Sequence, residues 1–318
     1  MISSHETDDT EMKKVTIVGA GNVGTTTAQL IAEKGLADVV LIDVLEGIPQ
    51  GKALDIFEAC PLWHSKARVT GTNDYADTAG SDIAVITAGL ARKPGMSRDD
   101  LLHANAKIIK AVALSIAEAS PDCIIIVVTN PMDAMAQVAR EVTGFPHSRV
   151  IGMGGVLDTA RMRSFISLRT GAHPKDIHAM VLGGHGDLMV PMTSLTTVRG
   201  ENIADVITES DMEQIIQRTK NGGAEIVGLL KSGSAYYAPA ASTVEMIESI
   251  LGIKTGTLPC SVYLTGQYGI DGVYTGVPVT LGPEGLKEII EIDLTNDELT
   301  ALRASAEAVR ELVGKLVL

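Results

Sequence analysis

The sequence K-V-T-I-V at Lys14–Val18 is followed by G-A-G-N-V-G at residues 19–24, and this stretch decides the fold class. The apolar pentapeptide predicts a short strand, and residues 25–34 have the pattern of a helix that Gly35 ends. A second apolar strand is predicted over residues 38–43 and finishes on an acidic residue. In this strand–turn–helix–strand context, G-x-G-x-x-G predicts dinucleotide binding.

Each position of the turn has a physical reason. Gly19 makes the tight turn, Gly21 lets the backbone approach a pyrophosphate, and Gly24 allows close helix–strand packing. The helix N-terminus then faces the phosphates. The Asp43 carboxylate can accept hydrogen bonds from the adenosine ribose and would repel a 2′-phosphate, so the sequence favours NAD over NADP. The alternative is a glycine-rich turn without a ligand.

Strands and helices continue to alternate through the first half. The pattern predicts helices over residues 49–63 and 97–119, and strands over 68–70, 82–87, 123–128 and 149–151. Ser97 and Asp100 have capping-box spacing at the start of the second of these helices. Such alternation predicts an α/β fold with a doubly wound parallel sheet.

The second half does not alternate in this way, which predicts an α+β substrate domain. Its expected elements are a helix carrying Asp158 and Arg161, a strand over 177–182, an antiparallel ribbon over 192–206, a helix over 211–230, a helix beginning near S-A-Y-Y-A-P-A, a hairpin over 260–281 and a helix over 296–317. We therefore expect a disordered acidic tail over residues 1–12, a dinucleotide-binding domain over 13–151 and a substrate domain over 152–318.

Composition excludes several classes of function. The 318 residues carry a net charge of −13 and only 3% aromatics, which argues against phosphate-backbone binding and against a base-stacking surface, so no nucleic-acid partner is expected. No apolar run approaches membrane-spanning length. Cys60, Cys123 and Cys260 are widely spaced, which indicates reduced thiols in a cytoplasmic protein, with no disulfide framework and no metal site.

A basic loop, T-A-G-L-A-R-K-P-G-M-S-R at residues 87–98, follows one buried strand. Its cations are Arg92, Lys93 and Arg98, and its glycines can act as hinges, which suits closure over a small anion. An acidic protein that binds an anion must gather its cations locally. The alternative is a solvated basic loop.

Other polar residues follow predicted strands or share helix faces. Asn105 lies on the same helix face as Arg98, and the alternative for it is an ordinary exposed helix residue. Asn130 follows the most apolar strand, where its amide can meet a ligand or cap the next helix, with Asp133 as a competing cap. Asp158 and Arg161 are either functional neighbours or a surface ion pair. His185, among three glycines in G-G-H-G-D, is either a proton-transfer group or a structural histidine.

Taken together, the motifs resemble the lactate/malate dehydrogenase family, and within it the lactate-dehydrogenase-like malate dehydrogenases. The matching stretches are G-A-G-N-V-G, T-A-G-L-A-R-K-P-G-M-S-R, V-T-N-P-M-D-A-M, G-V-L-D-T-A-R, G-G-H-G-D, S-G-S-A-Y-Y-A-P-A-A and Y-L-T-G-Q-Y-G. They extend over nearly the whole chain. The resemblance implies a Rossmann-type sheet and hydride transfer between NAD and malate or oxaloacetate.

The resemblance also assigns roles to residues. His185 matches the family's proton donor and acceptor, Asp158 its carboxylate partner, and Arg161 the group that binds the C1 carboxylate. Arg98 matches the group that polarises the reacting carbonyl, and Arg92 matches the position that meets the second carboxylate of a dicarboxylate substrate.

Asn130 matches the amide that orients the substrate and the nicotinamide, and Ser234 and Ala235 are expected along the pocket wall. The cofactor-binding positions implied by the resemblance are Gly19, Ala20, Gly21, Asn22, Val23, Gly24, Asp43, Asn105, Val128, Thr129 and Asn130.

Alternatives remain open at this level. A lactate or other 2-hydroxyacid dehydrogenase would share every motif residue, but Arg92 would have another role than pairing with a second substrate carboxylate. An NAD-dependent glycosidase would need a metal site, and a non-catalytic NAD-binding protein would not need Asp158, Arg161 and His185 together. The resemblance further implies a role in the tricarboxylic acid cycle and a homodimer or homotetramer. The helix over residues 50–63 resembles a family subunit interface, and the alternative is an ordinary helix that covers the sheet.

Overall fold

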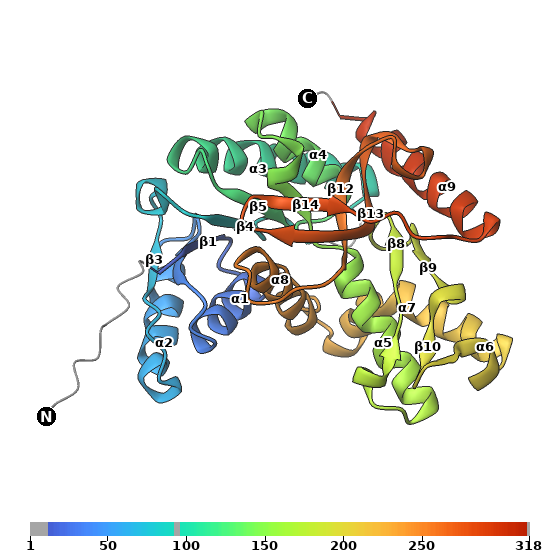
Figure 1. The fold of residues 1–318 in the computed structure, drawn as a ribbon. Helices are drawn as coiled ribbons and strands as arrows, with labels where there is room; N and C mark the ends of the chain where they lie inside the picture. The colour runs from blue at the N-terminus through green and yellow to red at the C-terminus, as the bar shows by residue number, and fades with distance from the viewer. Residues whose placement is uncertain (1–11, 92–95, 317–318) are drawn as a thin grey trace, which may run out of the picture.

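The computed structural model describes residues 12–91 and 96–316, so most of the expected tail over 1–12 lies outside the described residues. Within these ranges, eleven strands form one large sheet and three form a smaller one (Figure 1). The helices are α1 (Asn22–Glu33), α2 (Ile48–Trp63), α3 (Arg98–Ala119), α4 (Met132–Thr143), α5 (Gly155–Thr170), α6 (Ile203–Val206), α7 (Glu209–Leu230), α8 (Tyr237–Ile250) and α9 (Asn296–Val313).

The large sheet begins with a parallel half in the order β3-β2-β1-β4-β5-β6. Its strands are β1 (Lys14–Val18), β2 (Asp38–Ile42), β3 (Val69–Thr72), β4 (Ile83–Ile86), β5 (Ile124–Val127) and β6 (Val150–Gly152). The chain passes from β1 to β2 on one side and later continues through β4 on the other. The carboxyl ends of β1 and β4 therefore border the crevice in which open α/β sheets bind ligands.

Both faces of the parallel half are covered by helices, as predicted for a doubly wound sheet. In Figure 1, α3 and α4 lie on one face and α1, α2 and α8 on the other. Ile86 and Ile125 pack with the core of α3 and α4, whereas Ile17 and Val85 pack with the core of α1 and α8. The predicted capping box of Ser97 and Asp100 at the start of α3 is present.

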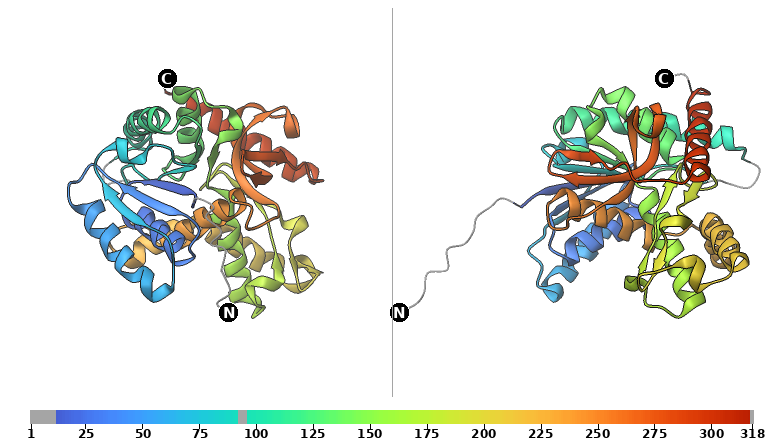
Figure 2. Two further views of the ribbon diagram at one scale, coloured as in Figure 1. Left: turned by 60° about the vertical axis from the view of Figure 1, so that its left-hand side comes forward. Right: turned by 45° about the vertical axis from the view of Figure 1, so that its right-hand side comes forward.

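Antiparallel strands extend this sheet beyond β6. Their order is β12-β13-β8-β9, and β14 pairs with β13. The bounds are β8 (Val181–Gly183), β9 (Met189–Pro191), β12 (Leu258–Thr265), β13 (Asp271–Gly282) and β14 (Gly285–Ile289). Figure 2 shows α5, α6 and α7 below this end of the sheet, and they enclose a third core that includes Met162, Ile166 and Ile215.

Three expectations for the second half were wrong in detail. The strand expected over 177–182 is split, because β7 (Ile177–His178) joins the small sheet with β10 (Thr197–Val198) and β11 (Glu201–Asn202), while β8 joins the large sheet. The ribbon expected over 192–206 ends early because the Asn202 side chain accepts from the Ala204 amide and starts α6. The last helix ends at Val313 rather than 317.

Candidate active site

The glycine-rich turn connects β1 to α1, and two of its glycines are required by the protein's own packing. Gly19 has φ +107°, and a Cβ there would lie 2.7 Å from the Thr87 hydroxyl. A Cβ on Gly24 would lie 1.9 Å from the Gly19 carbonyl oxygen. Both positions therefore exclude a side chain, as the sequence predicted for a tight turn and close packing.

Gly21 differs because a Cβ there would meet nothing within 4 Å, and its φ is −71°. Neither strain nor packing inside the protein explains this glycine. It is also the N-cap of α1, where no described side chain bonds to the first amides of the helix. An open approach to bare helix amides fits a phosphate group from outside the protein, so the turn fits a dinucleotide.

Asp43 lies at the carboxyl end of β2 and reaches the turn. Its carboxylate accepts from the Ala20 amide at 2.7 Å and from the Leu45 amide at 3.0 Å. The Lys52 ammonium on α2 donates to the Ala20 carbonyl at 2.7 Å. Two side chains therefore fix Ala20 from either side, and the contact of Lys52 was not expected from the sequence.

The ends of β4 and β5 are tied together by Asn105 of α3. Its side-chain oxygen accepts from the Leu90 amide at 2.8 Å, and its Nδ2 donates to the carbonyls of Leu90 at 3.2 Å and Asn130 at 2.6 Å. Asn105 is fully buried, whereas Asn130, which precedes a cis peptide bond to Pro131, is exposed. Asn105 therefore holds the base of the basic loop beside Asn130, and a cofactor contact of its own stays a prediction.

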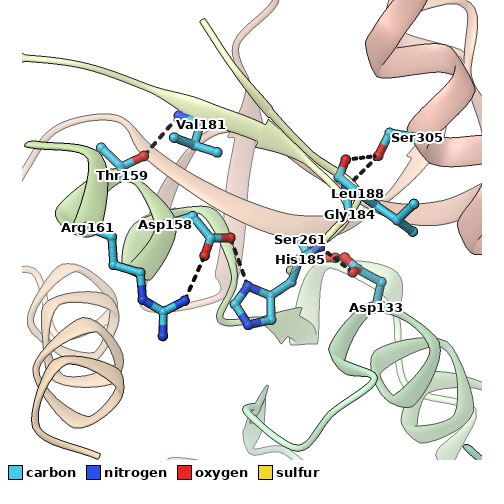
Figure 3. A network of polar contacts seen from close by, with 10 residues as sticks. All are labelled: Asp133, Asp158, Thr159, Arg161, Val181, Gly184, His185, Leu188, Ser261 and Ser305. Atoms are coloured by element: carbon cyan, nitrogen blue, oxygen red, sulfur yellow. Dashed lines mark hydrogen bonds and ion pairs between the residues drawn. The ribbon is translucent and has the colours of Figure 1, made fainter. Parts of the chain in front are cut away.

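Asp158 and Arg161 on α5 meet His185, which follows β8. The carboxylate of Asp158 lies 2.8 Å from Nδ1 of His185 and 3.4 Å from Nη1 of Arg161 (Figure 3). The side chain of Asp158 is 1% exposed, that of His185 12% and that of Arg161 13%. Because Nδ1 faces the carboxylate, Nε2 is the ring nitrogen left to exchange a proton with a substrate.

A second carboxylate, Asp133 of α4, holds the backbone of His185. It accepts from the His185 amide at 2.8 Å and from the Ser261 hydroxyl of β12 at 2.6 Å (Figure 3). The expectation that Asp133 could be an N-cap was wrong, because Pro131 is the N-cap of α4 and the Asp133 carboxylate is buried in the core.

Burial and charge act in opposite directions at this site. Burial by itself lowers the pKa of His185, but the charge and hydrogen bond of Asp158, with the charge of Asp133, raise it above its usual value. Burial raises the pKa of the Asp133 carboxyl and lowers the pKa of the Arg161 guanidinium. The imidazolium form of His185 is therefore stabilised, as a group that delivers a proton near neutral pH requires.

Arg98, the first residue of α3, reaches the loop after His185. Its Nη2 lies 2.7 Å from the carboxylate of Asp187, and the two side chains are 74% and 63% exposed. Arg92, the predicted specificity residue, and Lys93 lie outside the described residues. The contact of Arg98 with Asp187 was not expected, although Asp187 ends the G-G-H-G-D motif.

The described residues contain no group of three or more His, Cys, Asp or Glu side chains that could hold a metal ion. None of their helices is long and apolar enough to span a bilayer. Cys60, Cys123 and Cys260 are buried and free, and burial raises the pKa of the Cys123 thiol to about 12.

Two family models match the chain. The lactate/malate dehydrogenase NAD binding domain matches residues 13–152, and the lactate/malate dehydrogenase alpha/beta C-terminal domain matches residues 155–316.

Individual relatives cover almost the full length. The chain is 55% identical to a malate dehydrogenase of Thermomicrobium roseum over 95% of this chain and 97% of that protein. The crystal structure of Cryptosporidium parvum malate dehydrogenase superposes with a TM-score of 0.93 at 44% identity, covering 96% of this chain and 99% of that one. A lactate dehydrogenase from the same organism, complexed with lactic acid and nicotinamide adenine dinucleotide, gives a TM-score of 0.92 at 41% identity, covering 96% and 98%.

Proposed function

Because the chain belongs to the lactate/malate dehydrogenase family, we propose that it is an NAD-dependent malate dehydrogenase that interconverts (S)-malate and oxaloacetate. The bound cofactor would supply a hydride acceptor for C2 of malate as NAD, and a hydride donor to oxaloacetate as NADH. The observation that carries the proposal is the buried pair of Asp158 and His185 beside Arg161. This arrangement combines a proton-transfer group with a cation for a carboxylate.

His185 moves the proton in this reaction. As malate is oxidised, Nε2 takes the proton of the C2 hydroxyl, and in the reverse direction it returns that proton to the carbonyl oxygen. Asp158 holds the ring by Nδ1 and stabilises the imidazolium. Asp133 fixes the backbone of His185, so the ring is presented in one position.

Three further side chains bind the substrate. Arg161 pairs with the C1 carboxylate, since a guanidinium fork matches two carboxylate oxygens. Arg98 polarises the carbonyl after exchanging Asp187 for the substrate, and Asn130 orients the substrate beside the nicotinamide. Arg92 pairs with the distal carboxylate and thereby selects a dicarboxylate over pyruvate.

The carboxyl ends of β1, β2, β4 and β5 are the edge that would hold the cofactor. Residues 19–24 and the first amides of α1 hold the pyrophosphate, and Asp43 holds the adenosine ribose. Val128, Thr129 and Asn130 border the nicotinamide end, and Asn105 supports that end through its bonds to Leu90 and Asn130. The open position at Gly21 supports this placement.

Steady-state kinetics test the function. We expect kcat/KM for oxaloacetate with NADH to exceed kcat/KM for pyruvate, and NADH to be used better than NADPH. Preference for pyruvate would instead identify a lactate dehydrogenase, and equal use of NADPH would exclude Asp43 as the selecting residue.

The organisation of the chain is also part of the proposal. We assign residues 13–151 to cofactor binding and 152–318 to substrate binding, which the family models over 13–152 and 155–316 support. Apolar side chains are exposed on α2, namely Leu54, Phe57 and Leu62, and they support a homodimer or homotetramer that sedimentation would identify. The reaction supports a place in the tricarboxylic acid cycle, and three buried free thiols support a cytoplasmic location.

A further inference from the structure

The side chain of Arg161 lies against two adjacent glycines of α7, Gly222 and Gly223. A Cβ built on Gly222 would lie 3.2 Å from Cδ and 3.4 Å from Nε of Arg161. A Cβ on Gly223 would lie 3.6 Å from Nη2 of the same guanidinium. The first contact is closer than side chains normally accept, whereas the second is an ordinary van der Waals distance.

The conformation of α7 does not explain these glycines. Both lie inside a helix of 22 residues, where glycine is less stable than alanine, and neither has a positive φ. Gly222 is buried and Gly223 is half-buried. Gly228, later in the same helix, is exposed, and a Cβ there would meet nothing within 4 Å. Gly222 therefore differs from Gly228 in its contact with Arg161.

Among the residues that the structure describes, Arg161 has one side-chain hydrogen bond, to Asp158. Its bond to Asp158 is 3.4 Å long, which is long for a charge-assisted hydrogen bond. The side chain is nevertheless largely buried, and burial lowers the pKa of its guanidinium. A largely buried cation with one long bond depends on the surfaces packed against it for its position, and one of these surfaces is the bare backbone of α7.

We propose that Gly222 is a positioning residue of the carboxylate subsite, where its missing side chain lets Arg161 lie flat against α7 and so sets the place of the guanidinium. The proposal rests on the proposed role of Arg161 in binding the C1 carboxylate. Bidentate pairing of guanidinium and carboxylate depends on alignment, so a displacement of a few tenths of an ångström weakens substrate binding.

The test compares Gly222→Ala with Gly223→Ala and with the matched control Gly228→Ala. We expect Gly222→Ala to raise KM for oxaloacetate by roughly tenfold while kcat changes by less than about twofold, because Arg161 holds the carboxylate in the ground state and the transition state alike. The Tm should stay equal or rise, since alanine favours a helix. Gly223→Ala should raise KM less, and Gly228→Ala should leave it unchanged.

A crystal structure of Gly222→Ala provides a measurement independent of the reaction. We expect its Arg161 guanidinium to be displaced from the position in the unaltered protein. An undisplaced guanidinium, an unchanged KM for oxaloacetate, or an equal rise in KM for NADH together with a lower Tm would overturn the proposal.

Arg161→Lys separates this proposal from the function on which it rests. If the unaltered enzyme reduces oxaloacetate but Arg161→Lys leaves KM unchanged, the role of Arg161 is wrong. If Arg161→Lys raises KM and Gly222→Ala does not, only the role of Gly222 is wrong. If the unaltered enzyme does not reduce oxaloacetate, the proposed function fails, and the position of the guanidinium in the crystal still decides the role of Gly222.

Discussion

The Asp158–His185 pair and the Arg98–Asp187 pair have nearly the same bond length, 2.8 and 2.7 Å, but opposite burial. The first carboxylate is 1% exposed, and the second is 63% exposed. A buried pair keeps one geometry and resists screening, whereas an exposed pair contributes little and exchanges partners readily. Proton transfer needs the first property, and capture of an arriving anion needs the second.

The largest effect is expected from the buried pair. In His185→Asn, turnover should fall by roughly 10²–10⁴-fold because general acid–base catalysis is lost. Binding of NADH, measured by its fluorescence, should be largely unchanged, because the substitution does not alter the proposed adenosine site at Asp43. Near-normal activity in this variant would mean that another group carries the proton.

Arg92→Gln addresses the loop cations, although Arg92 lies outside the described residues. The distal carboxylate of bound oxaloacetate would then have no partner in the closed site. Removing one member of a buried charge pair typically costs about 2–5 kcal/mol, so kcat/KM for oxaloacetate should fall by roughly 30- to several-thousand-fold. Pyruvate has only a methyl group at that end and should lose nothing. The ratio of the two kcat/KM values is measured at one salt concentration, with Lys93→Gln as the control for loop charge. A ratio like that of the unaltered enzyme would place Arg92 in solvent.

Asp133→Asn tests how a second carboxylate influences the buried pair of Asp158 and His185. The charge of Asp133 helps to raise the pKa of His185, so its removal should lower that pKa. Oxaloacetate reduction needs protonated His185 and is lost as pH rises through this pKa, so the falling limb of kcat/KM should move to lower pH. We also expect kcat/KM to fall by roughly tenfold at neutral pH.

Ser261→Ala is the control for this variant because it removes the hydroxyl bonded to Asp133 and keeps the charge. In Ser261→Ala, the pH at which kcat/KM falls should lie closer to that of the unaltered enzyme. If kcat/KM falls over the same pH range in Asp133→Asn and in the unaltered enzyme, Asp133 does not influence proton transfer.

The smallest effect is expected at the exposed pair. In Asp187→Asn, Arg98 loses the partner that competes with substrate, so KM for oxaloacetate should fall by roughly two- to threefold at low salt. High salt should remove the difference. Asp122→Asn changes the net charge equally at a fully exposed position and serves as control. A KM that rises instead would show that Asp187 helps to place Arg98 rather than competing for it.

Sequence patterns predicted the parallel half to within one or two residues for most elements, because strands buried on both faces are continuous apolar runs. They placed β7 in one strand with β8, and β10 and β11 in a longer ribbon, because strands of two residues are too short for any periodicity to set their bounds. These strands are defined by their pairing with one another, since β10 pairs with both β7 and β11.

At the site, too, the sequence did not predict contacts between residues that are far apart in the chain. Motifs indicated His185, Asp158 and Arg161 as candidates because each lies in a short stretch with its own signature, and the structure brings the three together. The role of Asp133 could not be predicted in this way, since its partners His185 and Ser261 are 52 and 128 residues away in the chain. No sequence motif marks Gly222, because its proposed role follows from the packing of α7 against Arg161.

The sheet that begins at β1 is finished by chain made much later. β12 pairs with β6, the Tyr274 hydroxyl donates to the Val150 carbonyl at 3.1 Å, and α8 packs with α1 in one core. A nascent chain that has reached residue 151 therefore displays an open strand edge and an uncovered sheet face. The division between the two proposed binding regions is therefore not a division between folding units, because the large sheet is complete only after β14 has been synthesised up to residue 289.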